Sequence, residues 1–327
     1  MLIRHYSLFG DGVSLTGLHA EESFGRKIER RNWRRLDGIV EDGLEKAVAN
    51  NGYFRRFAIK DQRISNLQQK LKFEKNGSLT AFLGNSSEVM FALDPETVDA
   101  AVTSPPYYNA REYSQWENIY CYLFDMYNNA RGVFRCLKPG GYYLYNIFDY
   151  FDNERNISLS AMGQKRMILS SYIAFLFETA GFKYVQNVVW DKGAIEGKRA
   201  FNGGNFSPYY QAPFNCWEHV MVFRKPGDLV EITSPLPRAM KAQPVIKMVK
   251  GENRHGHTAP FPAGVPCLIT ERLPTGSLIL DPYAGSMTTA IAANEAKQKS
   301  ICIEMNEDYY NLGLRKFMDA TGQNWLK

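Results

Sequence analysis

Short apolar runs alternate along the chain with longer segments of mixed polarity. The short runs are rich in β-branched residues and are bounded by Gly, Pro, Asn or Ser, which is typical of buried strands. The longer segments predict helices, and several of them end at glycine or proline. We predict strands at 79–83, 97–102, 142–147, 182–190, 217–223, 277–281 and 300–304, and helices at 116–135, 162–180, 263–273 and 290–294.

Along much of the chain the predicted helices alternate with the predicted strands. Helices that alternate with apolar strands indicate a mostly parallel sheet that is covered by helices on both faces. The length of 327 residues and the hydrophobic content of 45% allow one large α/β domain with a smaller appendage. The sequence therefore predicts an α/β fold with a doubly wound, mostly parallel, Rossmann-like sheet.

The stretch that follows the strand at 97–102 is the first candidate for chemistry. It reads Thr-Ser-Pro-Pro-Tyr at 103–107. Neither proline can donate to a strand ladder, and each fixes φ near about −65°, so the turn is stiff. It combines a hydroxyl, backbone carbonyls without a competing N–H and an aromatic ring, which together suit a flat ring that carries an amino group. An ordinary proline-rich loop is the alternative.

A second candidate lies near the other end of the chain. The strand at 277–281 is followed by Pro-Tyr-Ala-Gly-Ser-Met-Thr-Thr at 282–289 and then by a helix. This is the layout of a nucleotide-binding site, because small residues let a ligand approach the backbone and the helix N-terminus. The next strand ends at Glu304, 23 positions after Asp281, where an acid commonly holds ribose hydroxyls. The absence of Gly-x-Gly-x-x-Gly argues against a nicotinamide cofactor.

Together, the stretches at 103–107 and 281–289 resemble the motifs (D/N/S)-P-P-(Y/F/W) and D-P-F-A-G-S-G-T-T of the amino-group DNA methyltransferases. Those enzymes transfer a methyl group from S-adenosylmethionine (SAM) to N4 of cytosine or N6 of adenine. The catalytic motif comes first, an order that resembles the β class of the family. The resemblance covers roughly 78–225 and 257–318. It implies SAM as the cofactor, double-stranded DNA as the substrate and a methyltransferase sheet with permuted motif order.

The resemblance also implies roles for single residues. Ser104 and the carbonyl of Pro105 would accept the hydrogens of the target amine, next to Pro106, and Tyr107 would stack on the base after it leaves the duplex. The stretch at 257–262 is similar to a family motif whose phenylalanine lines the pocket for the methionine half of SAM. The cofactor residues that the resemblance implies are Asn85, Thr103, Phe261, Asp281, Pro282, Tyr283, Ala284, Gly285, Ser286, Thr288, Thr289 and Glu304.

The target base and the activity itself have alternatives. Ser104 is a neutral acceptor, and the smaller ring of cytosine fits the same turn, which favours cytosine N4 over adenine N6. Met287 stands where the family has glycine, and its side chain either narrows the cofactor pocket or points away. A DNA-binding protein with a weakened or inactive methyltransferase fold is therefore a further alternative, as is methylation of RNA or a small molecule. Methylation at carbon 5 needs a cysteine nucleophile, but Cys267 falls in a predicted helix, where we expect it in the core.

The resemblance divides the chain into segments. Residues 77–225 would form the catalytic half of the core and 257–327 its SAM-binding half, with a short target-recognition or linker segment at 226–256. Residues 1–76 are a basic N-terminal extension, with 15 Lys and Arg against 10 Asp and Glu. Basic residues among aromatic ones suit contact with DNA, although local pairing with glutamates would make them a solvated helix surface. The DNA contacts that we expect are Arg30, Arg31, Arg34, Arg35, Lys198 and Arg199.

Charge and cysteine content bear on the partners and the compartment. A net charge of +5 and a pI of about 8.8 permit a polyanionic partner. The five cysteines show no CxxC spacing, and the apolar runs are too short for a bilayer, which predicts an intracellular protein without membrane contact. The resemblance implies a cytoplasmic, nucleoid-associated prokaryotic protein. His255 and His257 lack further ligands at suitable spacing, so we expect no metal site. A cognate restriction endonuclease is a partner that the resemblance suggests.

Overall fold

The computed structural model describes most of the predicted core. The described residues are 72–108, 116, 119–149, 168–193, 217–228, 230, 232, 236–238, 240, 243–247 and 261–322. The DNA contacts expected from the sequence therefore lie outside the described residues, as does the pair of histidines: Arg30, Arg31, Arg34, Arg35, Lys198, Arg199, His255 and His257.

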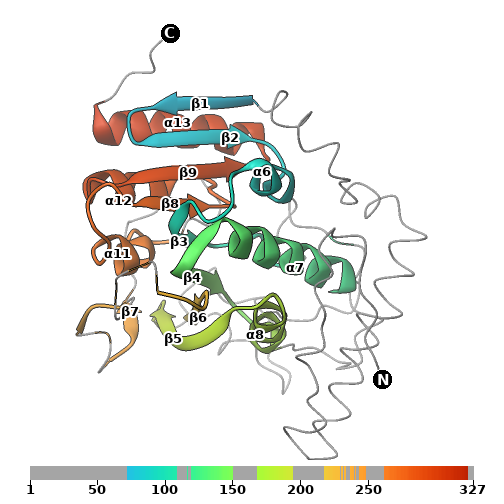
Figure 1. Cartoon of the computed structure of the whole chain (residues 1–327). Helices are drawn as coiled ribbons and strands as arrows, with labels where there is room; N and C mark the ends of the chain where they lie inside the picture. The colour runs from blue at the N-terminus through green and yellow to red at the C-terminus, as the bar shows by residue number, and fades with distance from the viewer. Residues whose placement is uncertain are drawn as a thin grey trace, which may run out of the picture.

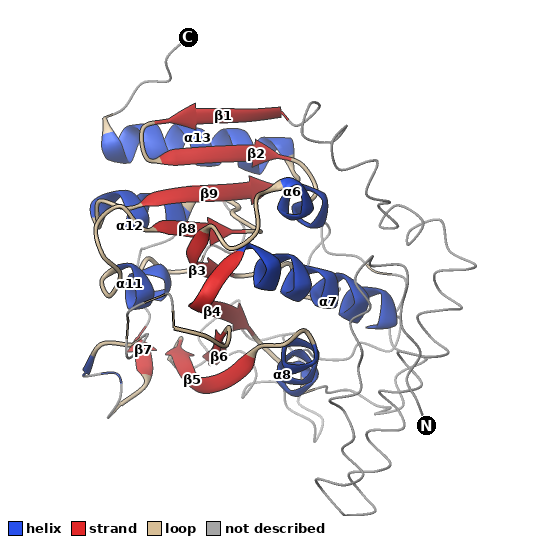
Figure 2. Ribbon diagram, viewed as in Figure 1, coloured by secondary structure: helices blue, strands red, loops and turns tan. Residues whose placement is uncertain are grey.

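One nine-stranded sheet runs through the described part of the chain, in the order β1-β2-β9-β8-β3-β4-β6-β5-β7 (Figures 1 and 2). Strands β1 and β6 are antiparallel to their neighbours, and the other pairings are parallel. The mostly parallel α/β sheet predicted from the sequence is confirmed. The strands are β1 Lys72–Asn76, β2 Leu79–Leu83, β3 Val98–Thr103, β4 Leu137–Ile147, β5 Lys183–Asp191, β6 Trp217–Arg224, β7 Val245–Lys247, β8 Leu278–Asp281 and β9 Lys299–Glu304.

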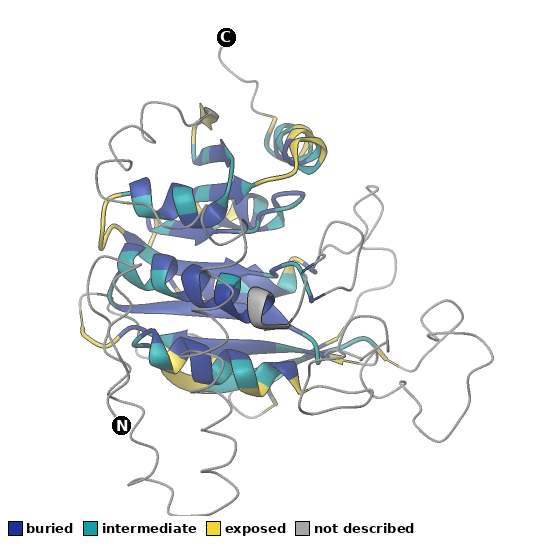
Figure 3. Ribbon diagram, turned by 90° about the vertical axis from the view of Figure 1, so that its right-hand side faces the viewer, coloured by how far each residue is buried: buried dark blue, intermediate teal, exposed yellow. Residues whose placement is uncertain are grey.

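Helices cover both faces of the sheet, which leaves its central strands buried (Figure 3). Alternate residues of β4 show the two faces: Tyr143 and Tyr145 pack with α7 and α8, whereas Tyr142 and Leu144 pack with α11. In the part of the chain that the structure describes, no helix is both long and apolar enough to cross a membrane. The helices are α6 Ser86–Ala92, α7 Ile119–Cys136, α8 Leu169–Thr179, α11 Gly264–Thr270, α12 Thr288–Glu295 and α13 Glu307–Thr321.

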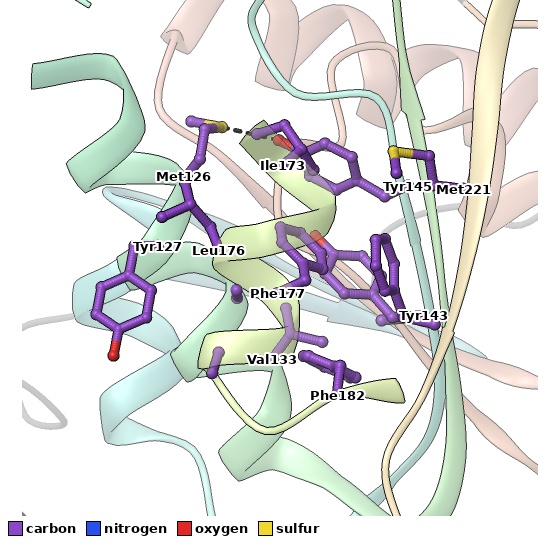
Figure 4. Close-up of a cluster of buried hydrophobic side chains, with 14 of the residues drawn as sticks. Met126, Tyr127, Val133, Tyr143, Tyr145, Ile173, Leu176, Phe177, Phe182 and Met221 are labelled. Carbon is purple, nitrogen blue, oxygen red and sulfur yellow. Dashed lines mark hydrogen bonds between the residues drawn. The ribbon is translucent and has the colours of Figure 1, made fainter. Parts of the chain in front are cut away.

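Aromatic rings fill the space between the sheet and helices α7 and α8 (Figure 4). Phe177 of α8 stacks on Tyr143 with ring centroids 5.3 Å apart and lies 4.5 Å from Phe223 of β6. The Tyr145 hydroxyl donates to the Met126 sulfur at 2.8 Å, so the polar end of this buried ring has a partner. Burial of each such ring contributes about 1.5–3 kcal/mol. This packing fixes the strands that carry the site.

Some element boundaries differ from the prediction, and local causes explain them. Strand β4 begins at Leu137, directly after α7, where the glycine and proline at 139–141 predict a turn; its regular pairing with β3 starts only at Tyr142. The sequence does not predict β1, which has three charged residues among five. This strand pairs with β2 across a turn at Gly77, whose φ is 53°. The sheet therefore begins before that turn. Helices α6 and α13 and strand β7 are also not predicted.

Candidate active site

The two motifs found in the sequence meet at one edge of the sheet. Strands β3 and β8 are parallel neighbours, with Ala101 opposite Leu280, so both end on the same side. Thr103 at the end of β3 donates from Oγ1 to Asp281 Oδ1 at 2.7 Å, across 178 positions of sequence. The turns that follow the two strands therefore start side by side, as a shared site requires.

Asp281 joins the two strand ends from a fully buried position. Its carboxylate accepts hydrogen bonds from Thr103 Oγ1, from Thr289 Oγ1 at 2.5 Å and from the Tyr283 backbone N–H at 3.1 Å. Burial raises the pKa of Asp281 to about 6, because water is excluded, while these hydrogen bonds oppose the rise. Through these hydrogen bonds Asp281 holds the end of β3 against the start of α12.

The turn between β8 and α12 is held by Glu304, the last residue of β9. Its Oε2 accepts from the Gly285 N–H at 2.9 Å, and its Oε1 accepts from the Asn306 N–H at 2.8 Å. An ionised carboxylate has about four acceptor positions, so the two backbone donors leave room for hydroxyl donors from a ligand. Burial raises the pKa of Glu304, and the backbone donors oppose that rise. Gly285 has a φ of 49°, in the region that favours glycine.

Met287 points away from this turn. Its backbone has a φ of 60°, and its side chain is fully buried among residues of β2, β9, α12 and α13. It packs on Gly313 of α13, where an added Cβ would lie only 2.7 Å from Met287 Cγ. Of the two orientations that the sequence allowed, the structure has the one in which the Met287 side chain points into the core.

The other residues expected at the cofactor are Asn85, Phe261 and the rest of the segment between β8 and α12. Asn85 caps α6, since its Oδ1 accepts from the N–H groups of Ser87 and Glu88 at 2.9 and 3.3 Å. This leaves the amide NH2 group of Asn85 for another partner. Phe261 is buried in the cluster that contains α11 and β3. Pro282, Tyr283, Ala284 and Ser286 connect β8 to α12, and Thr288 is the first residue of α12.

The turn after β3 forms a hydrogen-bonded cluster with β4, β5 and β6. The Tyr107 hydroxyl donates to Glu218 Oε2 at 2.6 Å, and Ser104 Oγ lies 3.0 Å from the same hydroxyl. Asn146 Nδ2 lies 3.1 Å from Ser104 Oγ and 2.6 Å from both the Tyr107 hydroxyl and Glu218 Oε2. Lys192 forms an ion pair with Glu218 Oε1. We call these five residues the tyrosine cluster.

Three members of this cluster are not among the site residues that the sequence predicts. Asn146, Glu218 and Lys192 converge because β4 and β5 end, and β6 begins, at the edge where β3 ends. A signal was present for Glu218, a carboxylate in an otherwise largely apolar predicted strand. Burial and the Glu218 carboxylate raise the pKa of Tyr107 well above its usual range, so its hydroxyl stays protonated.

Two other expectations concern metal ions and cysteine. Among the residues that the structure describes, no three His, Cys, Asp or Glu side chains are grouped so that they could hold a metal. Cys267 lies on α11, as predicted, but it is partly buried and not a core residue.

Comparison with known proteins agrees with the family that the two sequence motifs resemble. The family model of N6/N4 methyltransferases, described as DNA methylase, matches residues 98–315. The type II β methyltransferase M.BslI of Bacillus sp. (strain NEB-606) is 40% identical over 292 residues, which are 84% of this chain and 32% of that protein. The chain thus spans about a third of the length of that relative.

Solved structures share the fold. The PvuII DNA methyltransferase (cytosine-N4-specific) aligns with a TM-score of 0.59 at 18% identity, over 76% of this chain and 95% of that chain. A Thermus thermophilus protein solved with S-adenosyl-L-methionine aligns with a TM-score of 0.54 at 24% identity, over 74% and 93% of the two chains. Because the family model matches about two thirds of the sequence, this chain belongs to the N6/N4 amino DNA methyltransferase family.

Proposed function

We propose that this chain transfers a methyl group from SAM to the exocyclic N4 of a cytosine flipped out of double-stranded DNA. The observation that carries the proposal is the hydrogen bond between Thr103 and Asp281, which holds the amine-binding turn and the cofactor turn side by side. Holding two reactants in a fixed geometry supplies a large part of the rate enhancement in a direct transfer that forms no covalent enzyme intermediate.

The polar side chains at the end of β9 and at the start of α6 are suited to bind SAM. Glu304 keeps acceptor positions for a pair of ribose hydroxyls, and the NH2 group of Asn85 suits a ring nitrogen of adenine. Ala284 and Gly285 are small, so a ligand approaches the backbone at the start of α12 closely. Asp281 supports this site indirectly, because its partners fix the turn. When bound, SAM supplies an electrophilic methyl group.

The turn after β3 fits an aromatic amine. The lone pair of such an amine is delocalised into its ring, and acceptors that hold the amine hydrogens direct that lone pair toward the methyl group. Ser104 Oγ and the Pro105 carbonyl are acceptors of this kind, and the ring of Tyr107 is a stacking surface. Asn146 Oδ1 is fully buried and has no hydrogen-bond partner among the described residues, which supports a further acceptor role at this edge.

Cytosine is the favoured base because Ser104 is a neutral acceptor and the smaller ring fits the turn. Adenine N6 is the second candidate, since its amine also lies beside a ring nitrogen and suits the same acceptors. The orientation of Met287 into the core supports an active enzyme over a DNA-binding protein that has lost activity.

Family membership supports double-stranded DNA as the proposed substrate. Extrusion of the base is required because the amino group is paired inside the duplex, and the basic residues of the N-terminal segment are the proposed phosphate contacts. We further propose that a cognate restriction endonuclease cleaves the same DNA site when it is unmethylated.

Nucleoside analysis tests the proposal. DNA from a host that expresses the protein is digested to nucleosides and examined by mass spectrometry, with a host that carries the empty vector as the control. We expect N4-methylcytosine. N6-methyladenine in its place would move the assignment to the second candidate, and the absence of both would contradict the proposed function.

A further inference from the structure

The tyrosine cluster forms a chain of hydrogen bonds whose direction is fixed by its members. Lys192 can only donate, so Glu218 Oε1 is an acceptor in their ion pair. The Tyr107 hydroxyl has one hydrogen, which it gives to Glu218 Oε2 at 2.6 Å. The Tyr107 oxygen can then only accept, and Ser104, whose Oγ lies 3.0 Å away, is left as the donor. Asn146 Nδ2 is a further donor, 2.6 Å from both the Tyr107 oxygen and Glu218 Oε2 and 3.1 Å from Ser104 Oγ, so all three of these oxygens face a donor on this side.

The consequence concerns the free side of Ser104 Oγ. A serine hydroxyl ordinarily rotates and serves as donor or acceptor. Here its hydrogen is directed at Tyr107, so the remaining lone pair of Oγ is what the site presents to a ligand. If the hydroxyl hydrogen pointed at the exocyclic amine, two donors would face each other and no hydrogen bond would form. When the lone pair of Oγ points at the amine, the amine donates a hydrogen bond to it.

We propose that Glu218 and Lys192 are positioning residues that keep Ser104 an acceptor for the amine of the target base. The inference rests on the proposed function and deepens it. It depends on the hydroxyl of Tyr107 as well as on its ring, since a phenylalanine at this position would stack on a base but would break the chain. Glu218 is almost fully buried, with 6% of its side chain exposed, so water does not compete for its hydrogen bonds.

Glu218→Gln reverses the chain for a physical reason. A glutamine amide has one acceptor and one donor side, and Lys192 requires the acceptor. The amide NH2 group then faces Tyr107, whose hydroxyl turns to donate to Ser104, and the hydrogen of Ser104 points at the base. We expect the turnover number to fall about 100-fold, the effect of losing one oriented polar contact in a transition state, with SAM affinity unchanged.

Two further variants separate this chain from a general loss of packing. Tyr107→Phe keeps the ring and removes the hydroxyl through which the chain of hydrogen bonds runs. In this background, Glu218→Gln should lower the turnover number by less than about a further twofold. When Lys192→Met is combined with Glu218→Gln, the new amide no longer faces the lysine and can turn its oxygen toward Tyr107. The turnover number of this double variant should be at least about fivefold higher than that of Glu218→Gln alone. Glu96→Gln is the matched control, since Glu96 pairs with Lys225 outside the cluster.

The assay measures transfer of labelled methyl groups from SAM to unmethylated DNA, with SAM affinity by calorimetry. Equal losses from Glu218→Gln in both backgrounds, wild-type turnover of Glu218→Gln, or a double variant weaker than the single one would each overturn the inference. If Glu218→Gln misfolds and does not bind SAM, Tyr107→Phe alone tests the inference. Lower turnover at unchanged SAM affinity would support the proposed chain of hydrogen bonds, and wild-type turnover would refute it.

A spectroscopic readout is independent of activity. With tyrosine labelled at Cζ, the signal that disappears in Tyr107→Phe identifies Tyr107. We expect this signal to move upfield in Glu218→Gln, since the hydroxyl no longer donates to a carboxylate, and to stay in place in Glu96→Gln. An unmoved signal would overturn the inference. A wild-type protein that shows the expected Tyr107 shift but methylates no DNA would contradict the proposed function alone.

Discussion

Gly313 on α13 offers a test of how the core supports the cofactor turn. A Cβ added there would lie 2.7 Å from Met287 Cγ and 3.0 Å from the Gly285 carbonyl oxygen. The first distance is about 0.7 Å short of ordinary contact. Met287 is fully buried among the side chains of the cluster that it shares with α13, and protein interiors are close-packed. Gly313→Ala must therefore push α13 and the turn apart.

The magnitude follows from two opposing effects. Overpacking of a core by one methyl group costs about 1–3 kcal/mol. Alanine in place of glycine inside a helix returns up to about 1 kcal/mol. We expect Gly313→Ala to lower the free energy of unfolding by about 1–2 kcal/mol in urea denaturation. Because Gly285 moves relative to Glu304, SAM affinity measured by calorimetry should weaken by about 3- to 10-fold, an effect near 1 kcal/mol.

Two comparisons make this result specific. Gly132→Ala on α7 places a Cβ 2.8 Å from the flexible end of Met90, away from the cofactor turn, so its SAM affinity should equal that of the wild type. Met287→Ala in the Gly313→Ala background removes the shortest contact and should restore part of the affinity. Unchanged stability and affinity in Gly313→Ala, or equal weakening in Gly132→Ala, would refute the reasoning.

Three more variants test other contacts. Asp281 has a pKa of about 6 in the folded state against 3.8 for the free side chain, so the folded state binds more protons between these two values. The free energy of unfolding therefore falls by about 3 kcal/mol as the pH rises through this range. Asp281→Asn should remove this pH dependence in urea denaturation between pH 4 and 7, and parallel curves for the variant and the wild type would contradict the prediction. Thr103→Val deletes the donor to Asp281 and should cost about 1–3 kcal/mol in the same assay; wild-type stability would show that the hydrogen bond is not formed. Asn85→Ala removes a helix cap and should lose about 1 kcal/mol together with SAM affinity; a loss of stability with full affinity would exclude Asn85 from the cofactor site.

The sequence predicts the parts of this fold in which local pattern and burial agree. Strands such as 79–83 are largely apolar, and the structure has β2 at Leu79–Leu83. The hairpin strand β1 is not predicted because it is an edge strand that carries Lys72, Glu74 and Lys75 and is exposed at residues 73–75. Its pairing with β2 is a tertiary contact that a local pattern does not encode.

The site shows the same division. Ser104 and Asp281 are found from sequence because each belongs to a contiguous motif that follows a strand. Asn146, Glu218 and Lys192 belong to three other strand ends, and only the register of β4, β5 and β6 brings them to Tyr107. A buried carboxylate such as Glu218 is marked by its apolar surroundings, yet its partner is identified only in three dimensions.

The separate tasks of the two strand ends are the central claim, and paired measurements on Ser104→Ala and Asp281→Ala test it most directly. Single-turnover methyl transfer to DNA and SAM affinity by calorimetry are measured on both variants. Ser104→Ala should transfer about 100-fold more slowly while its SAM affinity stays within about twofold of the wild type. Asp281→Ala should first lose SAM affinity, by about tenfold or more. Equal losses of both quantities in both variants would contradict a site divided between the end of β3 and the end of β8.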